Sequence, residues 1–223
     1  MTRILVAHGT RDPEGQATVR AIRDAVASRV GPVRLAWLDV LTPTLPQLLA
    51  EIAGGPGDGP RRVVVVPMLL SEGFHISADI PEAVAALTES CDIRVAPPLG
   101  HDPRIIAALA DRLAEAGRQG GPVVLGATGS ARDSWRELAD RIATGLGERL
   151  GTQVTLGVLS GPGIPVSEQL SRSRGNVSVS AYLLAHGHFH RKLARSGAAV
   201  VAGPIGAHPA LVDLLVSRFS DSC

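Results

Sequence analysis

The chain has 223 residues, of which 45% are hydrophobic, so it is long enough to bury a core as one large domain or two small ones. Its 22 basic and 21 acidic residues are spread without long runs, which excludes a basic surface for nucleic acid and an acidic tail. Aromatic residues make up only 3%, so the chain offers no stacking platform for bases, and nucleic acid is not an expected partner.

In the first half of the chain, short apolar runs alternate with longer stretches whose apolar residues recur at helical spacing. The stretch 14–30 places four apolar residues on one stripe, as an amphipathic helix does: Val19, Ile22, Val26 and Val30. The apolar runs are nearly continuous, as in the buried strands of a parallel sheet. The predicted strands are 3–7, 33–39, 61–69 and 92–96. A strand and a helix thus alternate four times, and the glycine-rich linker 118–122 ends the series.

After the linker the same series begins again. A helix is predicted at 134–150, and the predicted strands are 122–127, 152–159, 176–184 and 198–203. The sequence RVAPPLGHDPRIIAALADRL matches VVAGPIGAHPALVDLLVSRF, with Gly100 opposite Gly206 and Pro103 opposite Pro209. We therefore predict a duplicated chain with one domain at 1–118 and a second at 122–223. Such a pair implies a cleft between the domains, with functional groups at the carboxyl ends of the strands.

His8 stands where the first predicted strand ends, in the sequence VAHGTRD. Gly9 permits a sharp turn there, and Thr10 or Asp12 can cap the helix that follows. The matching place in the second half reads GATGSARD, with Thr128 in the position of His8. The turn is therefore expected in both halves and the imidazole in only one. A histidine that is hydrogen-bonded into the turn is the alternative to a functional role.

The third predicted strand ends in PMLLSEGFHISADIP, where Glu72 and His75 precede a helix. The ends of the first and third strands of an open parallel sheet can face one crevice, so His8 and His75 could converge. Two neutral imidazoles with a nearby carboxylate suit a divalent transition metal and leave positions open for a substrate. Asp39, at the end of the second strand, and Glu72 are the candidate carboxylates. The alternatives are a capping role for Asp39, a solvated loop charge for Glu72, and packing of His75 on Phe74.

Three histidines alternate in LLAHGHFHRKL, the second copy of the loop that follows the third strand. An extended chain would place His186, His188 and His190 on one face, whereas a helix would align only His186 and His190. The three side chains could line a cleft, shuttle protons or bind a second metal. They could also simply form a polar loop.

The remaining features exclude several classes of protein. Cys91 and Cys223 form no spaced pattern, so neither a disulfide framework nor a thiolate metal site is expected, and a reducing cytoplasm fits. A signal segment is not recognisable near the amino terminus, and no apolar run reaches the length of a bilayer, so no membrane partner is expected. The turns carry no G-x-S-x-G elbow, P-loop or dinucleotide fingerprint, which argues against an α/β hydrolase and a nucleotide-binding protein.

Three motifs in order, LVAHGTRDPEG, PMLLSEGFHISADIP and PPLGHDPRI, resemble the CbiX/SirB family of sirohydrochlorin chelatases. The resemblance covers essentially the whole chain in the long two-domain form of the family. It implies an α/β fold of two tandem flavodoxin-like units of the class II chelatase type, each a four-stranded parallel sheet flanked by helices. It also implies that His8 and His75 are the metal ligands and that Asp39 takes the place of an acidic residue, commonly Glu, that faces the cleft.

The second half departs from this metal-binding pattern, because Thr128 replaces His8 and Phe189 replaces His75. We therefore expect one working half and a degenerate copy that completes the cleft. The resemblance implies a lyase-class enzyme that inserts a divalent metal, with Fe²⁺ favoured, into sirohydrochlorin to form siroheme. A cobaltochelatase of cobalamin biosynthesis is the first alternative, and a non-catalytic metal or tetrapyrrole carrier is the second.

For this reaction we assign catalytic roles to His8, His75, Asp39 and Glu72. The two histidines bind the metal, and a carboxylate orients an imidazole or carries the pyrrole protons to solvent. The substrate has many carboxylates, so cationic and polar groups should hold its rim. The candidates for this role are Arg11, Ser71, Gly73, Arg132, His186 and His190. No permanent cofactor is expected, because the metal is itself a substrate, and we expect a cytoplasmic monomer.

Overall fold

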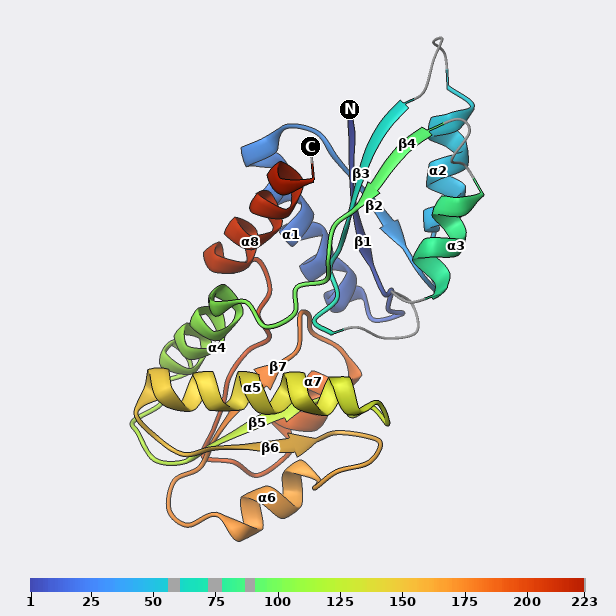
Figure 1. The fold of residues 1–223 in the computed structure, drawn as a ribbon. Helices are drawn as coiled ribbons and strands as arrows, with labels where there is room; N and C mark the ends of the chain where they lie inside the picture. Colours follow the sequence, from blue (N-terminus) through green and yellow to red (C-terminus); the bar gives the residue numbers. More distant parts are fainter. Residues whose placement is uncertain (56–60, 72–77, 87–90, 223) are drawn as a thin grey trace. The chain divides into compact units, whose positions relative to one another are not determined.

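The computed structural model describes residues 1–55, 61–71, 78–86 and 91–222 of the chain (Figure 1). Within these ranges the strands form two separate four-stranded sheets, and every strand pair in them is parallel. The first sheet has the order β2-β1-β3-β4 and the second has the order β6-β5-β7-β8. The two orders are the same once the numbering is shifted by four, which confirms the predicted duplication of an α/β unit.

The strands of the first sheet lie where the apolar runs predict them. They are β1 (Thr2–Ala7), β2 (Val33–Trp37), β3 (Arg61–Pro67) and β4 (Cys91–Val95). The strand β1 lies between β2 and β3, so the carboxyl ends of β2 and β3 both lie beside the end of β1. Four consecutive valines, at 63–66, are fully buried in β3, because helices cover both faces of this sheet.

Four helices belong with this sheet. They are α1 (Pro13–Val30), α2 (Leu45–Ala53), α3 (Ile80–Ala85) and α8 (Pro209–Asp221). The start of α2 is fixed by a capping box, in which the Thr44 side chain accepts from the Gln47 backbone and the Gln47 side chain accepts from the Thr44 backbone. Leu45, Leu48 and Leu49 then form the buried stripe of α2, which packs on the face of the sheet that Ile4, Val6, Val63 and Val65 line.

The second sheet repeats this arrangement with shorter strands. They are β5 (Val123–Ala127), β6 (Val154–Val158), β7 (Ser178–Tyr182) and β8 (Val200–Val201). The helices around it are α4 (Pro103–Glu115), α5 (Asp133–Leu150), α6 (Val166–Arg172) and α7 (His188–Ala194). Two glycines let helices approach the sheet closely, since a Cβ on Gly126 would lie 2.6 Å from Leu193 and one on Gly157 would lie 2.9 Å from Val166.

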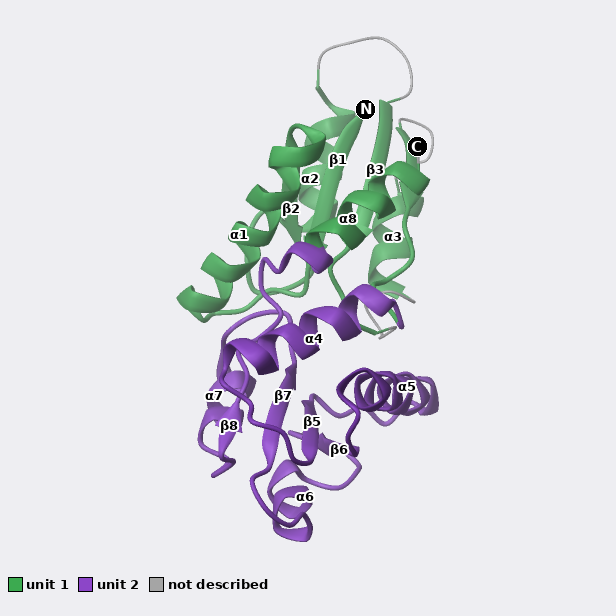
Figure 2. Ribbon diagram, turned by 90° about the vertical axis from the view of Figure 1, so that its left-hand side faces the viewer, with its two compact units in different colours: residues 1–100, 212–223 green, residues 101–211 purple. Residues whose placement is uncertain are grey.

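The chain divides into two compact units that do not coincide with the predicted domains 1–118 and 122–223. Unit 1 contains residues 1–100 and 212–223, and unit 2 contains residues 101–211 (Figure 2). The last helix of each sequence repeat is therefore grouped with the other repeat's sheet. Within unit 2, α4 packs on α5 and β7.

Within unit 1, the helix α8 is bonded to α1 and to the segment after β4. Arg29 of α1 forms an ion pair with Asp213, and Arg218 donates to the carbonyl of Pro98 at 3.3 Å. The glycine linker is thus the boundary between the two sequence repeats. The boundary between the two compact units lies instead in the turn before α4 and within α8.

No helix among the described residues is both long enough and apolar enough to cross a bilayer.

Candidate metal site

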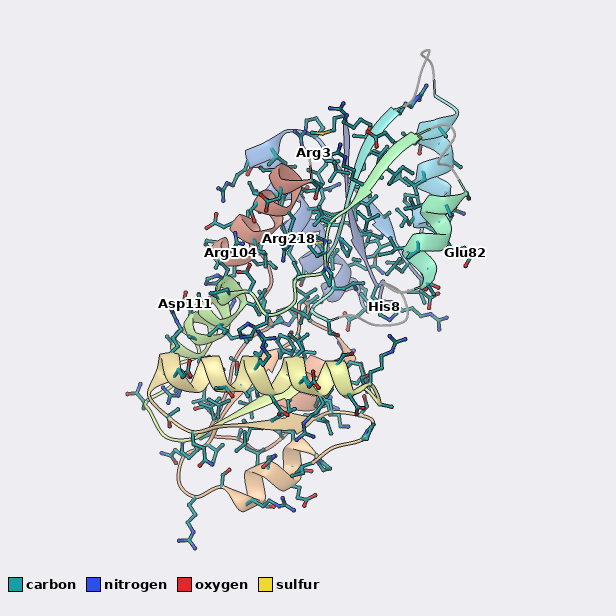
Figure 3. All side chains as sticks on the ribbon, viewed as in Figure 1. Arg3, His8, Glu82, Arg104, Asp111 and Arg218 are labelled. Atoms are coloured by element: carbon teal, nitrogen blue, oxygen red, sulfur yellow. The ribbon has the colours of Figure 1, made fainter. Side chains whose placement is uncertain are left out.

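His8 and Asp39 are brought together by the pairing of β1 with β2. The strands pair in register up to Ala7 and Trp37, and the ladder continues beyond both ends. The backbone amide of Leu38 donates to the carbonyl of Ala7, and that of Asp39 donates to the carbonyl of His8, each at 2.9 Å. The two residues are therefore backbone neighbours at the carboxyl edge of the sheet. Both are exposed (Figure 3 labels His8 where β1 ends).

Gly9 determines how the chain leaves β1. Its φ is +105°, and a Cβ at this position would lie 2.1 Å from the carbonyl oxygen of Asp39. Only glycine fits such a close approach of two backbones in this conformation. The turn thus keeps the backbone of Gly9, which follows His8, in close contact with the backbone of Asp39.

The turn after His8 is closed by its own side chains. The Thr10 hydroxyl accepts from the amide of Asp12 at 3.1 Å, and the Asp12 carboxylate accepts from the amide of Glu14 at 3.0 Å. Asp12 is thus the N-cap of α1, as the sequence predicts, and Thr10 supports it. Arg11 lies between them with an exposed side chain at the edge of the candidate site.

The carboxylate of Asp39 also stabilises the turn. Its Oδ1 accepts from the amide of Val40 at 2.7 Å, and Val40 has a φ of +56°, which is rare for a β-branched residue. The capping role considered for Asp39 is therefore present in the structure. It uses one carboxylate oxygen and leaves the other for a second partner, so capping and metal binding are compatible.

The strand β3 leads its following segment to the same edge. Val6 of β1 is paired with Pro67, and the amide of Met68 donates to the carbonyl of Val6 at 2.8 Å. Ser71, a candidate for contacts with the substrate rim, lies on this segment, which leaves the sheet beside β1. Glu72, Gly73 and His75 lie outside the described residues, and their predicted roles stay predictions. Within the described ranges, no three His, Cys, Asp or Glu side chains are grouped so that they could hold a metal ion.

The second unit has a similar close approach of two backbones at the equivalent place but neither side chain. The amide of Leu159 donates to the carbonyl of Ala127 at 2.8 Å, and a Cβ on Gly129 would lie 1.8 Å from the carbonyl oxygen of Ser160. Thr128 thus stands where His8 stands, and Ser160 stands where Asp39 stands. A hydroxyl pair replaces an imidazole and a carboxylate, so this edge of unit 2 lacks the ligands that a divalent transition metal prefers.

The three alternating histidines are divided by the start of α7. His186 precedes the helix and its ring meets that of His190 edge to face, with the ring centroids 4.7 Å apart. His190 also lies 3.2 Å from the carbonyl oxygen of Ala202 through its Nε2. His188 is turned away and contacts Phe189 instead. Neither alternative describes the stretch in full, because α7 begins at His188 and His186 lies before it, although His186 and His190 do meet and His188 does not join them.

Arg132, the second-unit candidate for contacts with the substrate rim, is the N-cap residue of α5 and is exposed. Its amide donates to the Ser130 hydroxyl at 3.2 Å, which repeats the bond between Asp12 and Thr10 in unit 1. The bond from the amide to the hydroxyl is thus retained in both units, but the expected side-chain cap is present only in unit 1, because Arg132 makes no cap hydrogen bond at the start of α5. The sequence reasoning missed Lys192, which donates to the carbonyl of Leu159 beside Ser160. The signal that could have identified it is that the chain has no other lysine.

The sheet edge that carries His8 and Asp39 lies in the part of the chain that matches a known protein family. The family model for CbiX matches residues 2–116, which contain His8, Asp39 and the segment after β3. The chain belongs to the CbiX family. Membership in the CbiX family agrees with the motifs from which the resemblance was drawn, and it rests on the repeat that carries the candidate metal ligands.

Curated relatives are similar over about half of the chain. A protein named sirohydrochlorin cobaltochelatase from Methanosarcina acetivorans is 30% identical over 125 residues, which cover 51% of this chain and 94% of that one. A protein of the same name from Methanothermobacter thermautotrophicus is 27% identical over 132 residues, covering 51% of this chain and 90% of that one. This CbiX-family chain is thus about twice as long as the part shared with these relatives.

Solved structures match the whole chain. SirB from Bacillus subtilis with Fe³⁺ superposes with a TM-score of 0.84 at 23% identity, covering 100% of this chain and 96% of that one. The sirohydrochlorin chelatase SirB from B. subtilis subspecies spizizenii in complex with cobalt gives 0.83 at 23% identity, covering 100% and 95%. The predicted class II chelatase fold of two α/β units is confirmed by this likeness.

Proposed function

We propose that the protein is a lyase-class sirohydrochlorin chelatase whose metal-binding residues lie in unit 1. The observation that carries the proposal is the pairing of His8 and Asp39 as backbone neighbours at the carboxyl edge of the first sheet. This edge lies within the part of the chain that matches the CbiX model. The names of the curated relatives supply the substrate class.

The reaction exchanges two pyrrole protons of the macrocycle for one divalent metal ion. The protein must therefore hold a partly dehydrated M²⁺ and provide groups that accept protons near neutral pH. A neutral imidazole at His8 supplies a nitrogen lone pair to the metal, and histidine is a residue type that can also accept a proton. The carboxylate of Asp39 lowers the cost of bringing a cation to the edge of the sheet and can pass protons to solvent.

His75 and Glu72 complete this site in the proposal. The segment that carries them leaves β3 next to β1, since Met68 is bonded to Val6. A His75 imidazole would provide the second nitrogen ligand, and two nitrogens with one carboxylate leave coordination positions open for the incoming macrocycle.

We propose that unit 2 contributes no metal ligand at its equivalent edge. Thr128 and Ser160 replace His8 and Asp39 there, although a glycine again lies against a backbone carbonyl of the neighbouring strand. One metal site for each chain follows, and one chain that contains both repeats should act as a monomer. Arg11, Arg132, Ser71, Gly73, His186 and His190 are proposed to contact the carboxylate rim of the tetrapyrrole, and Lys192 is treated separately below.

Iron is our preferred metal and siroheme the preferred product. Cobalt is the second candidate, and it is favoured by the name cobaltochelatase that the curated relatives carry. Imidazole and carboxylate ligands accept Fe²⁺ and Co²⁺ alike, so the choice between them depends on geometry and on metal supply. The two ions therefore form two arms of one experiment.

The test is anaerobic metallation of sirohydrochlorin, followed by absorbance with Fe²⁺ and with Co²⁺. His8→Ala and Asp39→Asn should each slow metallation, and His8→Ala should reduce it to the spontaneous rate. Thr128→Ala is the matched control, because Thr128 occupies the same backbone position in unit 2. It should leave the rate within about twofold of the wild type, as expected for a surface change of less than about 0.5 kcal/mol.

Metallation by His8→Ala at the wild-type rate would contradict the assignment of His8. Metallation that the wild-type protein does not accelerate, combined with tight binding of the metal or of sirohydrochlorin, would instead identify a carrier. Equal loss in Thr128→Ala and His8→Ala would contradict the proposal that only one unit is catalytic.

A further inference from the structure

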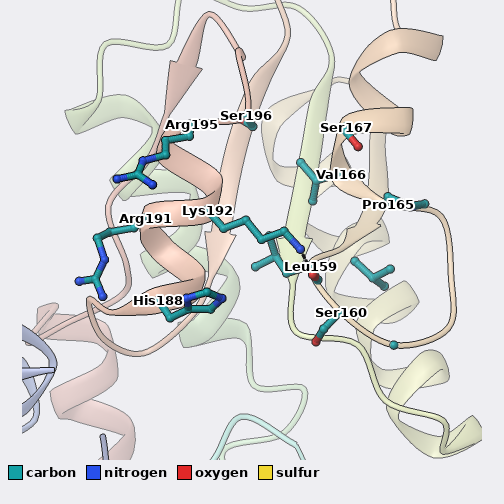
Figure 4. Close-up of a pocket in the computed structure, with 12 residues that line it drawn as sticks. Leu159, Ser160, Pro165, Val166, Ser167, His188, Arg191, Lys192, Arg195 and Ser196 are labelled. Carbon is teal, nitrogen blue, oxygen red and sulfur yellow. Dashed lines mark hydrogen bonds between the residues drawn. The ribbon is translucent and has the colours of Figure 1, made fainter. Parts of the chain in front are cut away.

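A cavity in unit 2 lies between α7 and the segment that joins β6 to α6. Its volume is about 520 Å³, and it opens at the carboxyl end of β6, on the side of Ser160 (Figure 4). Ser160 and Ser167 supply hydroxyl groups to its wall, and Val158 and Val166 supply an apolar floor. The cavity thus occupies the place in unit 2 that corresponds to the Asp39 edge of unit 1.

Basic side chains form the other wall. Figure 4 shows His188 and Lys192 extending from α7 toward the segment that contains Leu159 and Ser160, and the Lys192 ammonium donates to the carbonyl of Leu159. An ammonium has three donors, so this bond leaves two for a ligand. Arg191 and Arg195 also line the cavity, and in Figure 4 their guanidinium groups extend from the other side of α7.

None of the described residues that line this cavity has an acidic side chain. Between Glu168 and Asp213 the sequence contains no Asp or Glu, although it contains five Arg or Lys residues. In the part of the chain that the structure describes, neither Lys192 nor Arg195 forms an ion pair. Their positive charge is therefore not compensated by the protein, and a cavity with uncompensated charge of one sign concentrates ligands of the other sign.

Basic residues elsewhere in the protein are arranged differently. In unit 1, another cavity is lined by Arg34, Arg61 and Arg62 together with an acidic residue, Glu51, which is paired with Arg34 at 2.8 Å. A further cavity of about 510 Å³ lies beside α3, the helix that corresponds to α7. It is lined by Asp79 and Glu82, and none of the described residues that line it is basic. The two copies of this region thus carry opposite charge, acidic in unit 1 and basic in unit 2.

We propose that the cavity between α7 and the β6–α6 segment binds a small molecule that carries two or more oxyanion groups. Carboxylate and phosphate groups share the required chemistry, since both accept charge-assisted hydrogen bonds from ammonium and guanidinium groups. Lys192 contacts one oxyanion inside the cavity, with the Ser160 and Ser167 hydroxyls as further donors. Arg191 and Arg195 turn toward a second oxyanion at the mouth, which their exposed side chains allow.

Three sources of such a ligand can be distinguished: a free polycarboxylate, a phosphate compound, or the carboxylate rim of a tetrapyrrole. The site is formed by unit 2 alone, so the proposal does not depend on metal insertion by unit 1. A protein that inserts no metal could still bind an oxyanion in this cavity, and the two proposals fail separately.

The single lysine makes a direct binding measurement possible. Reductive methylation with ¹³C-formaldehyde labels Lys192 and the terminal amine and keeps the positive charge of each. The resonance that disappears in Lys192→Arg identifies the lysine. Citrate, inorganic phosphate and metal-free sirohydrochlorin are then titrated separately into the labelled protein, with sodium chloride at matched ionic strength as the reference.

We expect at least one of the three probes to shift the Lys192 resonance in a saturable manner, and the probe that does so identifies the source. Arg195→Gln should weaken that binding by about tenfold, as for the loss of one charge-assisted hydrogen bond. Arg174→Gln is the matched control, since Arg174 is also an exposed arginine of unit 2 but does not line the cavity. It should change the affinity by less than about twofold, a loss of about 0.4 kcal/mol.

Two results would overturn the proposal. The first is a shift that sodium chloride reproduces at the same ionic strength, because that is screening without a site. The second is an equal loss of affinity in Arg195→Gln and Arg174→Gln, because that is attraction to the net charge of the unit. Calorimetry with Lys192→Met provides an independent readout, and undiminished binding of the probe by this variant would also contradict the assignment.

Discussion

Replacing Gly9 by alanine tests whether the turn after β1 holds His8 beside Asp39. The substitution adds one methyl group, and that group would lie 2.1 Å from the carbonyl oxygen of Asp39. The backbone there also has a φ of +105°, which L-residues rarely adopt. Neither the oxygen nor the turn can move without displacing the end of β2, because the amide of Asp39 is bonded to the carbonyl of His8 at 2.9 Å.

The expected loss of stability is the sum of two contributions. A strained φ costs about 1–3 kcal/mol, and forcing a methyl group into a packed contact costs about 1–3 kcal/mol more. Gly9→Ala should therefore lower the free energy of unfolding by about 2–6 kcal/mol, a large part of the about 5–15 kcal/mol that a domain usually has.

Two other glycines separate these contributions. Gly31 has a φ of +82°, and a Cβ added there would meet no atom within 4 Å, so Gly31→Ala carries the conformational cost alone. Gly129 does not have a positive φ, but its Cβ would lie 1.8 Å from the carbonyl oxygen of Ser160, so Gly129→Ala carries the steric cost alone. Urea unfolding of the three variants should show the greatest loss for Gly9→Ala.

Metallation of sirohydrochlorin by the folded fraction of each variant supplies the second readout. Gly9→Ala should lose activity because the turn beside His8 is displaced, whereas Gly31→Ala and Gly129→Ala should retain it per folded molecule. The reasoning is refuted if Gly9→Ala is no less stable than Gly31→Ala, or if its folded fraction inserts metal at the wild-type rate.

Three further predictions concern unit 2. Burial raises the pKa of Tyr182, so above about pH 10 the folded state keeps a proton that the unfolded chain releases. The free energy of unfolding should therefore fall above about pH 10, by about 1.4 kcal/mol per pH unit. Below about pH 10 this group should have no effect, and Tyr182→Phe should abolish the slope in urea titrations at alkaline pH, whereas an unchanged slope would assign it to another group. His208 accepts from the amide of Ala210 at 3.2 Å, as a helix cap does. His208→Ala should therefore lower the free energy of unfolding by about 1 kcal/mol, and His208→Asn should lower it much less. Equal losses for the two variants in urea unfolding would contradict a capping role. A Cβ on Gly126 would lie 2.6 Å from Leu193, so a double-mutant cycle of Gly126→Ala with Leu193→Val should show a coupling of more than about 0.5 kcal/mol, and additive losses would contradict this contact.

The positions of His8 and Asp39 could be predicted because strand ends are encoded locally. Apolar runs locate β1 and β2, and in a parallel sheet their carboxyl ends lie at one edge. The face that His186 and His190 share could not be chosen in advance. The contact joins His186, which precedes α7, to His190 within the helix, and a stretch with alternating polar residues fits an extended chain and a helix start equally well.

The grouping of α4 and α8 could not be predicted for a different reason. Hydrophobic periodicity defines which face of a helix is buried, but it does not define which sheet buries that face. The two helices occupy equivalent places in the sequence repeats, so each offers a similar apolar stripe. The outcome depends on long-range contacts, such as the bond from Arg112 of α4 to the carbonyl of Ile205 at 3.1 Å and the ion pair of Asp213 in α8 with Arg29.

The comparison of the two repeats separates residues that the fold requires from residues that the chemistry requires. Gly9 and Gly129 both lie against a backbone carbonyl of the neighbouring strand, so both units need a glycine there whether or not a metal is bound. The glycine therefore carries information about packing alone. A threonine, Thr128, occupies the position of His8 in unit 2, and a glycine still follows it against the neighbouring carbonyl. An imidazole beside a carboxylate at an exposed sheet edge, present in one unit and absent from the equivalent place in the other, is what the proposed single metal site requires.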